Sequence, residues 1–310
     1  MDRRVVHIIN PASGGGRKFK TVRDAIRSLG EELYITTKNG DAEDFVASLT
    51  AKDPTVHIVA HGGDGTMCEA VSGIMKSGAG ATSLFSGVAV GSGNDFLRYM
   101  TEEKCGEGSI FPTDVIRVGD LYSVNVLNIG FDCTVVVEAE RARRAPFVGN
   151  SFSYILGVVG ALFRKEAFTT EVTLRDVLLP DGTTKDEVLP RGDYLLAAVA
   201  NGRYYGGGFK VAPRADSSDG FLDVILVKNV SVPKFAALVS GFRKGTHIEE
   251  DLSVKKKYGD VMLFRRCRGI KLDGIERICR DGEISDASSV DAEIIKGAIS
   301  YTPARREWLL

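Results

Sequence analysis

Apolar residues in the first hundred positions follow two alternating spacings. Short apolar runs rich in β-branched residues, at 5–9, 33–36, 56–60 and 88–90, predict strands. Between them, apolar residues recur every three or four positions and predict helices with the stripes Val22, Ile26 and Leu29, then Phe45, Val46 and Leu49, then Met67, Val71, Ile74 and Met75. Apolar strands that alternate with helices are typical of a parallel sheet covered on both faces, so this part is predicted to be an α/β domain.

The pattern changes near residue 113. Alternating apolar runs predict strands at 124–129, 170–179, 193–200, 221–227, 261–264 and 277–279. The dipeptides Asp181-Gly182, Asp219-Gly220, Asp273-Gly274 and Asp281-Gly282 favour hairpins or tight turns. Helical spacing returns at about 134–165 and 232–243. The second part is therefore predicted to be largely antiparallel β-structure.

The length of 310 residues fits two domains. We place them at 1–112 and 113–296, and leave open that the tail 297–310 rejoins the first. No long linker or low-complexity tract separates them, so we expect the domains to pack directly with a cleft between them.

Charge and composition exclude several classes of function. The net charge is −1, which argues against binding of DNA or RNA over a broad basic surface. Five widely spaced cysteines without a CxxC pair indicate neither a disulfide framework nor a zinc site, and suit a reducing cytoplasm. The apolar run 5–9 is too short for a signal peptide, and the run 154–163 is about half of a membrane crossing.

Glycine is enriched at 35 residues, and eleven of these lie in the clusters 14–16, 62–65, 91–93 and 206–208. The first cluster follows a predicted strand and precedes a predicted helix, as Asn10-Pro11-Ala12-Ser13-Gly14-Gly15-Gly16. Such a turn aims backbone N–H groups at an anion, and phosphate is the natural ligand. The segment is neither a Walker A loop nor a GxGxxG turn, and an ordinary βα loop is an equal alternative.

The second and third clusters have the same setting. His61-Gly62-Gly63-Asp64-Gly65-Thr66 and Gly91-Ser92-Gly93-Asn94-Asp95-Phe96 each follow a predicted strand. Asp64 would repel a triphosphate unless a divalent cation lay between them, which favours a Mg²⁺-nucleotide; the alternative is a helix cap. Three such turns would meet at the carboxyl edge of a parallel sheet, where open α/β folds bind ligands.

These residues resemble the catalytic domain shared by diacylglycerol kinases, sphingosine and ceramide kinases and the related bacterial lipid kinases. Asn10 to Gly14 is similar to the family's NPxSG, Gly62 to Thr66 to GGDGT, Gly91 to Phe96 to GTxNDF and Asp281 to Glu283 to DGE. The segment 36–41 resembles TTxxGDA. GGDGT alone is shared with NAD kinases, whereas the four motifs in this order are highly specific. The length is similar to that of the small bacterial members.

The resemblance implies transfer of the γ-phosphoryl group of ATP to a lipid hydroxyl, with Mg²⁺, between an α/β domain of NAD kinase and phosphofructokinase type and a C-terminal β-sandwich. It implies a nucleotide site formed by Asn10, Ser13, Gly14, Thr36, Gly63, Asp64, Gly65, Thr66, Glu69 and Ser92. It assigns Glu283 as the base for the acceptor hydroxyl, beside Asp281 and Asp64. It also implies a second, structural Mg²⁺ at Asp216, Asp219 and the carbonyl of Phe221. Taken without the family, Asp281, Glu283, Asp216 and Asp219 are more typical of solvated turns.

Two positions depart from the family pattern: Ala89 replaces a proline and Ser92 a threonine, and nucleotide affinity is expected to fall slightly. His61 stands where a small residue is usual. We interpret it as a partly buried histidine at a strand end rather than a catalytic group.

A lipid kinase of this kind would be cytoplasmic and bound peripherally to the membrane. The segment 141–165 has basic ends and an apolar middle, as interfacial or acyl-binding segments do, although a core helix has the same pattern. Lys255 to Lys257 and Arg265, Arg266 and Arg268 are further candidates for headgroup contact. The lipid acceptor is the expected partner and a homodimer is left open. The alternatives are a soluble-metabolite kinase of NAD kinase type and a sensor that binds nucleotide or lipid without catalysis.

Overall fold

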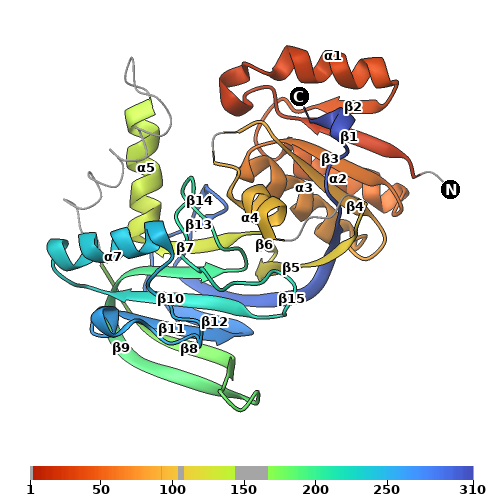
Figure 1. Cartoon of the computed structure of the whole chain (residues 1–310). Coiled ribbons are helices and arrows are strands. Elements are labelled where there is room, and N and C mark those ends of the chain that lie inside the picture. The colour runs from red at the N-terminus through yellow and green to blue at the C-terminus, as the bar shows by residue number, and fades with distance from the viewer. Residues whose placement is uncertain (1–2, 92, 104–107, 144–166, 310) are drawn as a thin grey trace.

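The computed structural model describes residues 3–91, 93–103, 108–143 and 167–309. The chain forms two lobes side by side (Figure 1). The N-terminal lobe contains β1 (Val5–Ile9), η1 (Ser13–Gly16), α1 (Phe19–Leu29), β2 (Glu32–Ile35), α2 (Asp41–Lys52), β3 (His57–Gly62), α3 (Asp64–Ser77), β4 (Leu84–Ala89) and α4 (Asp95–Glu103).

The strands of the N-terminal lobe form a parallel sheet in the order β2-β1-β3-β4. The central strands are buried along most of their length, as expected for strands covered on both faces. All four carboxyl ends lie at one edge of this sheet, and the turns that follow β1, β3 and β4 are the glycine-rich segments.

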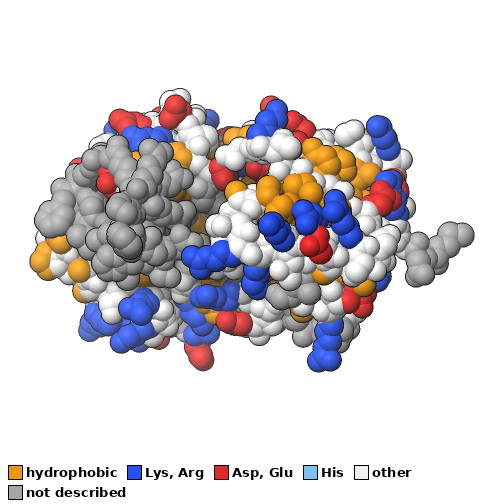
Figure 2. Space-filling view, turned by 90° about the horizontal axis from the view of Figure 1, so that it is seen from above, with side chains coloured by type: hydrophobic (Ala, Val, Ile, Leu, Met, Phe, Trp, Pro, Cys, Tyr) orange, Lys and Arg blue, Asp and Glu red, His pale blue; other side chains and the backbone are white. Residues whose placement is uncertain are grey.

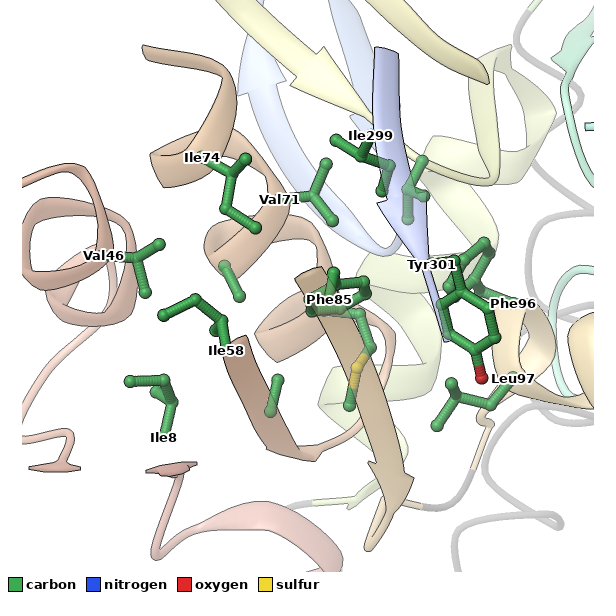
Figure 3. Packing of buried hydrophobic residues seen from close by; sticks show 14 of the residues in the cluster. Ile8, Val46, Ile58, Val71, Ile74, Phe85, Phe96, Leu97, Ile299 and Tyr301 are labelled. Carbon is green, nitrogen blue, oxygen red and sulfur yellow. The ribbon is translucent and has the colours of Figure 1, made fainter. Parts of the chain in front are cut away.

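Each face of the parallel sheet has its own apolar core. Side chains of β1 such as Ile8 pack against α2 and α3 in the larger core (Figure 3). Ile9 points the other way, toward Val22 and Ile26 of α1 and Trp308 near the C-terminus. The alternation along β1 follows from the pleat of a strand, which sends neighbouring side chains to opposite faces. Leu29, predicted on the buried stripe of α1, is 43% exposed because it is the last residue before the Gly30 cap.

The C-terminal lobe is antiparallel apart from its contact with β4. It contains β5 (Phe111–Val118), β6 (Leu121–Ser123), β7 (Val126–Gly130), α5 (Phe131–Arg143), β8 (Phe168–Leu178), β9 (Thr184–Ala200), β10 (Leu222–Lys228), α7 (Val232–Lys244), η2 (Lys256–Tyr258), β11 (Met262–Cys267), β12 (Gly269–Asp273), β13 (Arg277–Arg280), β14 (Glu283–Asp286), β15 (Ser289–Tyr301) and η3 (Arg306–Trp308). One apolar core lies within the β-structure, and a second lies between the strands and the helices α5 and α7.

The strand β15 joins the two lobes. It pairs antiparallel with β5 and β12 of the C-terminal lobe, and its last residues, Ser300 and Tyr301, pair parallel with β4. Beyond it, Trp308 is fully buried in the N-terminal lobe. The chain therefore ends on the lobe where it began.

The predicted fold class, a parallel α/β lobe followed by an antiparallel sandwich-like lobe, is confirmed. The predicted helix at 232–243 is α7, and the helix predicted from 134 begins at Phe131 as α5. Residues 144–166, which hold most of the predicted interfacial segment, lie outside the described residues. Among the helices that are described, none combines the length and the apolar character needed to span a bilayer.

Candidate active site at the sheet edge

The three glycine-rich turns touch one another, and we call the surface formed by residues 10–16, 62–66, 90–91 and 93–96 the glycine rim. A Cβ atom at Gly14 would lie 2.4 Å from the carbonyl oxygen of Val90. A Cβ atom at Gly91 would lie 2.6 Å from the Cα of Gly63. Side chains at these positions would push the turns apart, so glycine is required by close approach, and at Gly14 also by its φ of 61°.

Polar contacts fix the first turn to the second. The Asn10 amide nitrogen donates to Thr66 Oγ1 at 3.2 Å, and the Asn10 amide oxygen accepts from the backbone N–H of Ala12 at 3.0 Å. Thr36, which follows β2, donates its backbone N–H to the carbonyl of Ile9 at 3.0 Å. The residues predicted to surround a nucleotide from three separate segments are therefore neighbours at the same sheet edge.

The second turn leads directly into α3, which begins at Asp64 without a side-chain cap on Gly63. A helix beginning leaves backbone N–H groups without intrahelical acceptors and carries partial positive charge. A Cβ atom at Gly62 would lie 2.3 Å from Thr66 Oγ1, so the turn is closed tightly over the first turn of the helix. This arrangement suits an anionic ligand.

Two carboxylates, the half-buried Asp64 and the buried Asp95, lie close together at the rim. Asp64 accepts a hydrogen bond from the backbone N–H of Phe96 at 3.2 Å, and burial together with the charge of Asp95 raises the pKa of Asp64 to about 7. Asp95 is 3% exposed and accepts from the backbone N–H of Gly207 at 2.7 Å. Burial also raises the pKa of Asp95, and its other oxygen, Oδ1, has no hydrogen-bond partner among the described residues.

Glu283 reaches the rim from the other lobe. It is the first residue of β14 and is exposed, and a Cβ atom at Gly65 would lie 2.9 Å from Glu283 Oε1. Gly65 is the neighbour of Asp64 in the first turn of α3. The structure thus brings together the two predicted carboxylates that lie farthest apart in the sequence.

Asp281 has a different setting from Glu283. It forms the β13–β14 hairpin turn with Gly282, both with positive φ (47° and 96°), as a type I′ turn requires. Its buried carboxylate accepts hydrogen bonds from Ser123 Oγ and from the backbone N–H groups of 124, 125 and 126, at 2.7 to 3.1 Å. Burial raises its pKa, and these donors oppose the rise. The carboxylate therefore anchors the hairpin that carries Glu283.

The carboxylate of Glu69 also accepts hydrogen bonds from backbone N–H groups. Its two carboxylate oxygens accept from the backbone N–H groups of Gly40 and Ala42, at 3.0 and 3.2 Å, and so hold the beginning of α2. Burial raises the pKa of Glu69, and the charge of Glu283 adds to the effect. Glu69 lies close to the rim, and its contacts are those of a group that positions the segment after β2.

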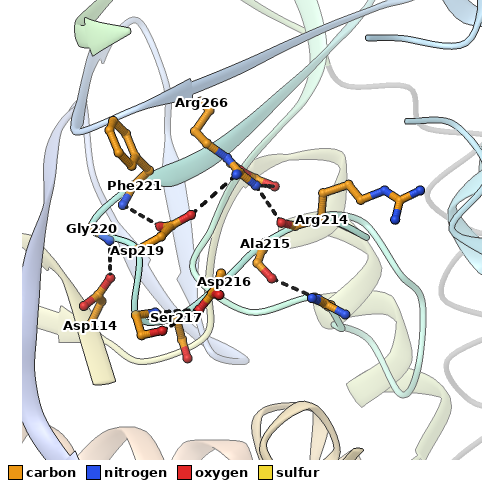
Figure 4. Close-up of polar contacts among 12 residues, drawn as sticks. Asp114, Arg214, Ala215, Asp216, Ser217, Asp219, Gly220, Phe221 and Arg266 are labelled. Carbon is orange, nitrogen blue, oxygen red and sulfur yellow. Dashed lines mark hydrogen bonds and ion pairs between the residues drawn. The ribbon is translucent and has the colours of Figure 1, made fainter. Parts of the chain in front are cut away.

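In the loop predicted to bind a second magnesium ion, the acidic residues already accept hydrogen bonds from other protein groups (Figure 4). Asp216 Oδ1 accepts from the N–H and hydroxyl of Ser218. Asp219 accepts from the N–H of Phe221 at 2.8 Å and lies 3.5 Å from a guanidinium nitrogen of Arg266. The ammonium group of Lys296 donates to the Asp219 carbonyl at 3.2 Å. The described residues include no group of three or more His, Cys, Asp or Glu side chains suited to a metal; magnesium at this loop stays a prediction.

Other predicted positions have clear locations. His61 is fully buried rather than partly buried, and its ring nitrogen lies 2.8 Å from that of His7. Arg265 and Arg266, candidates for headgroup contact, form ion pairs with Glu187 and Asp223. Ser92 lies outside the described residues.

Sequence reasoning placed Asp95 in the third motif and gave it no role. Its position opposite Asp64 depends on Gly207, a residue 112 positions away that belongs to the fourth glycine cluster. The glycine cluster at 206–208 was the signal in the sequence that could have indicated this contact, but it matched none of the family motifs and was given no function.

The comparisons with known proteins identify the family of this chain. Residues 4–129 match the family described as diacylglycerol kinase catalytic domain, and residues 125–301 match the YegS C-terminal NAD kinase beta sandwich-like domain. The chain is 30% identical over 268 residues to a diacylglycerol kinase of Mycobacterium tuberculosis, covering 80% of this chain and 81% of that one. It is 27% identical over 255 residues to a "probable lipid kinase YegS-like" of Stenotrophomonas maltophilia, covering 77% and 78%.

Solved structures show the same fold. A diacylglycerol kinase from Bacillus anthracis str. Sterne superposes with a TM-score of 0.68 at 21% identity, covering 96% of each chain. Both lobes and the motifs of the glycine rim are thus accounted for by one group of proteins, and the chain belongs to the diacylglycerol kinase catalytic-domain family, with a YegS-like C-terminal domain.

Proposed function

We propose that this protein transfers the γ-phosphoryl group of ATP to the hydroxyl group of a lipid, with Mg²⁺, at the glycine rim. The observation that carries the proposal is the approach of Glu283 to Gly65, which sets a carboxylate of one lobe beside the helix beginning and Asp64 of the other. Phosphoryl transfer requires little more than a positioned phosphate, neutralised charge and an aligned acceptor.

The glycine rim supports the binding of a triphosphate. Backbone N–H groups at the start of α3 would face its oxygens, and the α3 dipole would stabilise the negative charge. Asn10, Thr36 and Thr66 would border the nucleotide, with Glu69 holding the segment after β2.

The residues present at the rim fit a divalent cation. The fit rests on the Asp64 and Asp95 pair: two like charges lie close together where solvent is partly excluded, and Asp95 Oδ1 has no partner among the described residues. Carboxylate oxygens are the ligands that Mg²⁺ takes in phosphoryl-transfer sites. When bound, the ion would neutralise phosphate charge.

Glu283 would act as the base. Its carboxylate would accept the proton of the acceptor hydroxyl as that oxygen forms its bond to the γ-phosphorus; the bond from phosphorus to the β,γ-bridging oxygen breaks, and ADP leaves with the electron pair. Asp281 would not touch the substrate. Its four hydrogen bonds would fix the hairpin turn. They would therefore also fix the position of Glu283, which follows Asp281 by two residues.

The lipid acceptor is proposed from the family to which the chain belongs. A small apolar pocket of about 10 Å³, with room for about one water molecule, is lined by Phe131, Asp132, Tyr205, Phe209, Phe235, Val239 and Phe242. Burial raises the pKa of Asp132 to about 7, and the Tyr205 hydroxyl donates to it at 3.2 Å. The same loop, through Gly207, contacts Asp95. A pocket of this size does not hold an acyl chain.

The test is incubation of the purified protein with γ-labelled ATP and a total lipid extract, followed by identification of the labelled product. We expect one lipid to become labelled, and Glu283→Gln to lower turnover by about 100-fold or more. Glu276→Gln is the matched control, because Glu276 is exposed and lies at the open end of the same hairpin, just before β13 and away from the turn that carries Glu283. Near-normal turnover by the Glu283 variant would remove it from its role.

The two other functions give different results in the same assay. A soluble-metabolite kinase of NAD kinase type would be active without lipid vesicles. A sensor would bind ATP in a single-turnover experiment without consuming it. We also propose a cytoplasmic protein bound peripherally to the membrane that supplies the acceptor.

A further inference from the structure

The hairpin that carries Glu283 touches α3 at a second point. Arg280 is the last residue of β13, and in the register of the hairpin it stands opposite Glu283, the first residue of β14. Residues paired in this way send their side chains to the same face of a hairpin. Glu283 lies against Gly65, and Arg280 reaches Cys68, three residues further along α3. Both side chains therefore contact one side of the helix.

The contacts of Arg280 meet at one backbone carbonyl. Its Nη1 donates to the carbonyl oxygen of Tyr122 in β6 at 2.6 Å and lies 3.8 Å from Cys68 Sγ. The Cys68 thiol donates to the same carbonyl at 3.3 Å. Burial raises the pKa of this thiol well above its usual value, so it keeps the proton that it donates. We call Cys68, Tyr122 and Arg280 the lobe junction, because they connect α3 of one lobe with β6 and β13 of the other.

The lobe junction differs from the charged groups on the surface. Seen from above, Lys and Arg side chains as well as Asp and Glu side chains lie along the boundary between the lobes, open to solvent (Figure 2). Exposed charges of this kind contribute little to holding two parts of a protein together. Cys68 is 3% exposed and Arg280 is half-buried, so their hydrogen bonds are shielded from competing water.

Stability alone does not account for an arginine at position 280. Arg280 Nε is buried and has no hydrogen-bond partner among the described residues. A buried donor without an acceptor costs free energy, and an apolar side chain at this place would avoid that cost. The guanidinium adds a fixed contact across the lobe boundary, made by the residue directly opposite Glu283.

An arginine beside a phosphate site can also bind the phosphate itself, but the place of this guanidinium favours a different role. Its charge acts on Cys68 and on Lys76, which lie about one and about three turns beyond Gly65 along α3. The backbone N–H groups proposed to face a triphosphate are those at the start of the helix. Arg280 therefore lies beside α3, beyond the part that would hold the nucleotide.

Asp281 fixes the same hairpin in a different direction. Its four hydrogen bonds come from residues 123–126, which belong to the C-terminal lobe. They set the turn relative to that lobe. The contact of Arg280 with Cys68 reaches the N-terminal lobe, and so it sets the hairpin relative to α3.

We propose that Arg280 is a positioning residue for the proposed phosphoryl transfer. By binding the Tyr122 carbonyl and the Cys68 sulfur, it holds Glu283 at a fixed distance from the start of α3. The proposal rests on the proposed function for the role of Glu283, whereas the mechanical role of Arg280 can be measured without turnover. A misplacement of about 1 Å at a reacting group lowers rates by up to about 100-fold, so loss of the junction should be visible in kcat.

The first experiment is hydrogen exchange of the full chain without nucleotide, read by mass spectrometry of peptides from residues 277–286. Arg280→Met keeps the length and the apolar stem of the side chain and removes its donors and its charge. We expect it to raise exchange in the hairpin by about tenfold, because hydrogen bonds from a charged donor are lost. Arg277→Met is the matched control on the same strand: it removes an exposed pair with Glu276 and should exchange like the wild type.

The second experiment measures kcat and KM for ATP with the lipid that becomes labelled in the assay above, at a temperature at which each variant is folded. Arg280→Met should lower kcat by about tenfold or more and change KM for ATP by less than about twofold, because the nucleotide would be held by the other lobe. Arg280→Lys retains the charge and an N–H donor and should recover most of the lost kcat. Arg280→Met combined with Cys68→Ala should lose no more than Arg280→Met alone, since both changes break the same junction.

Exchange and kcat equal to those of the wild type in Arg280→Met would overturn the proposal, as would equal losses in Arg277→Met. A rise of about tenfold in KM for ATP at unchanged kcat would also overturn it, because Arg280 would then act as a phosphate ligand. If the wild type labels no lipid, the proposed phosphoryl transfer fails, and the exchange experiment still decides whether Arg280 holds the hairpin.

Discussion

Two acidic regions of this protein use the same residue type in opposite ways. At the glycine rim, the half-buried Asp64 lies beside the buried Asp95, and one oxygen of Asp95 has no partner among the described residues. In the loop from Asp216 to Phe221, the carboxylates accept hydrogen bonds from neighbouring backbone and hydroxyl groups, and Arg266 lies against Asp219 and Asp223. In the first region the charge of Arg98 acts on Asp95 without forming an ion pair, whereas in the second Arg266 forms ion pairs with the carboxylates.

The difference teaches that burial alone does not define a ligand site. A buried carboxylate is costly unless donors or a cation compensate it. Where the protein supplies the compensation, as Arg266 does, the carboxylate contributes to the fold. Where compensation is incomplete, as at the rim, the proposed cation would supply it.

Among the variants that test this comparison, Asp64→Asn is expected to have the largest effect on activity. It should lower phosphoryl transfer by about 100-fold or more because the cation and its phosphate lose their carboxylate. The melting temperature of the nucleotide-free protein should not fall, since one of two like charges has been removed. Turnover and thermal melting check both; a large fall in melting temperature would mean that Asp64 is a structural group like Asp223.

Arg266→Gln should instead affect stability. Asp223 is 2% exposed and would be left unpaired, so we expect a loss of about 3 kcal/mol in unfolding free energy. Arg265→Gln is the matched control on the same strand: its pair with Glu187 is more exposed, and its loss should cost about 1 kcal/mol. If EDTA lowers the stability of the nucleotide-free wild type and Arg266→Gln does not, a metal ion rather than Arg266 organises the loop.

The buried histidines should make the N-terminal lobe sensitive to acid. Burial lowers the pKa of His57 to about 4 and that of His61 to about 3, against 6.5 for the ordinary side chain. The unfolded chain therefore binds protons below pH 6.5 before the folded protein does. Each of the two residues should cost about 1.4 kcal/mol per pH unit as the pH falls from 6.5 toward 4.

Urea unfolding at a series of pH values measures this loss. His61→Asn should reduce the slope of unfolding free energy against pH by the contribution of one histidine. A stability that does not change between pH 6.5 and 5 would show that the histidines are protonated in the fold, and that the lobe compensates their charge as the Arg266 region does.

Asp95→Asn should give the smallest effect. An asparagine can still accept the Gly207 N–H, while repulsion of Asp64 disappears, so we expect the nucleotide-free protein to gain about 1 kcal/mol in unfolding free energy. The variant should lose the stabilisation that Mg²⁺ and ATP give to the wild type. Retention of that stabilisation would contradict the role of the pair.

The sequence predicted the elements whose pattern is local. The strands β1, β3 and β4, the helix α7 and the Asp281-Gly282 hairpin were all expected from spacing or turn residues. The strand β15 was not expected, although Val290, Ala292 and Ile294 alternate along it. Its three pairings, with β5, β12 and β4, depend on segments far away in the chain. The local hydrophobic pattern carries no information about such pairings.

The candidate site shows the same limit. Motifs placed Asp64 and Glu283 in one site through resemblance, and the structure brings their segments together. The motif alone grouped Asp281 with Glu283, and only the hydrogen bonds to the 123–126 segment distinguish an anchoring carboxylate from an exposed one. The role of Asp95 required the contact with Gly207.

The strand shared by both lobes has a mechanical consequence. Because β15 is hydrogen-bonded into two sheets, the lobes cannot swing apart without bending it. Its pairing with β5 shifts register between Ile295 and Ile299, where Gly297 has a φ of 58° and donates to Asp114. A bend of β15 at this irregular stretch would change the distance between Glu283 and the start of α3.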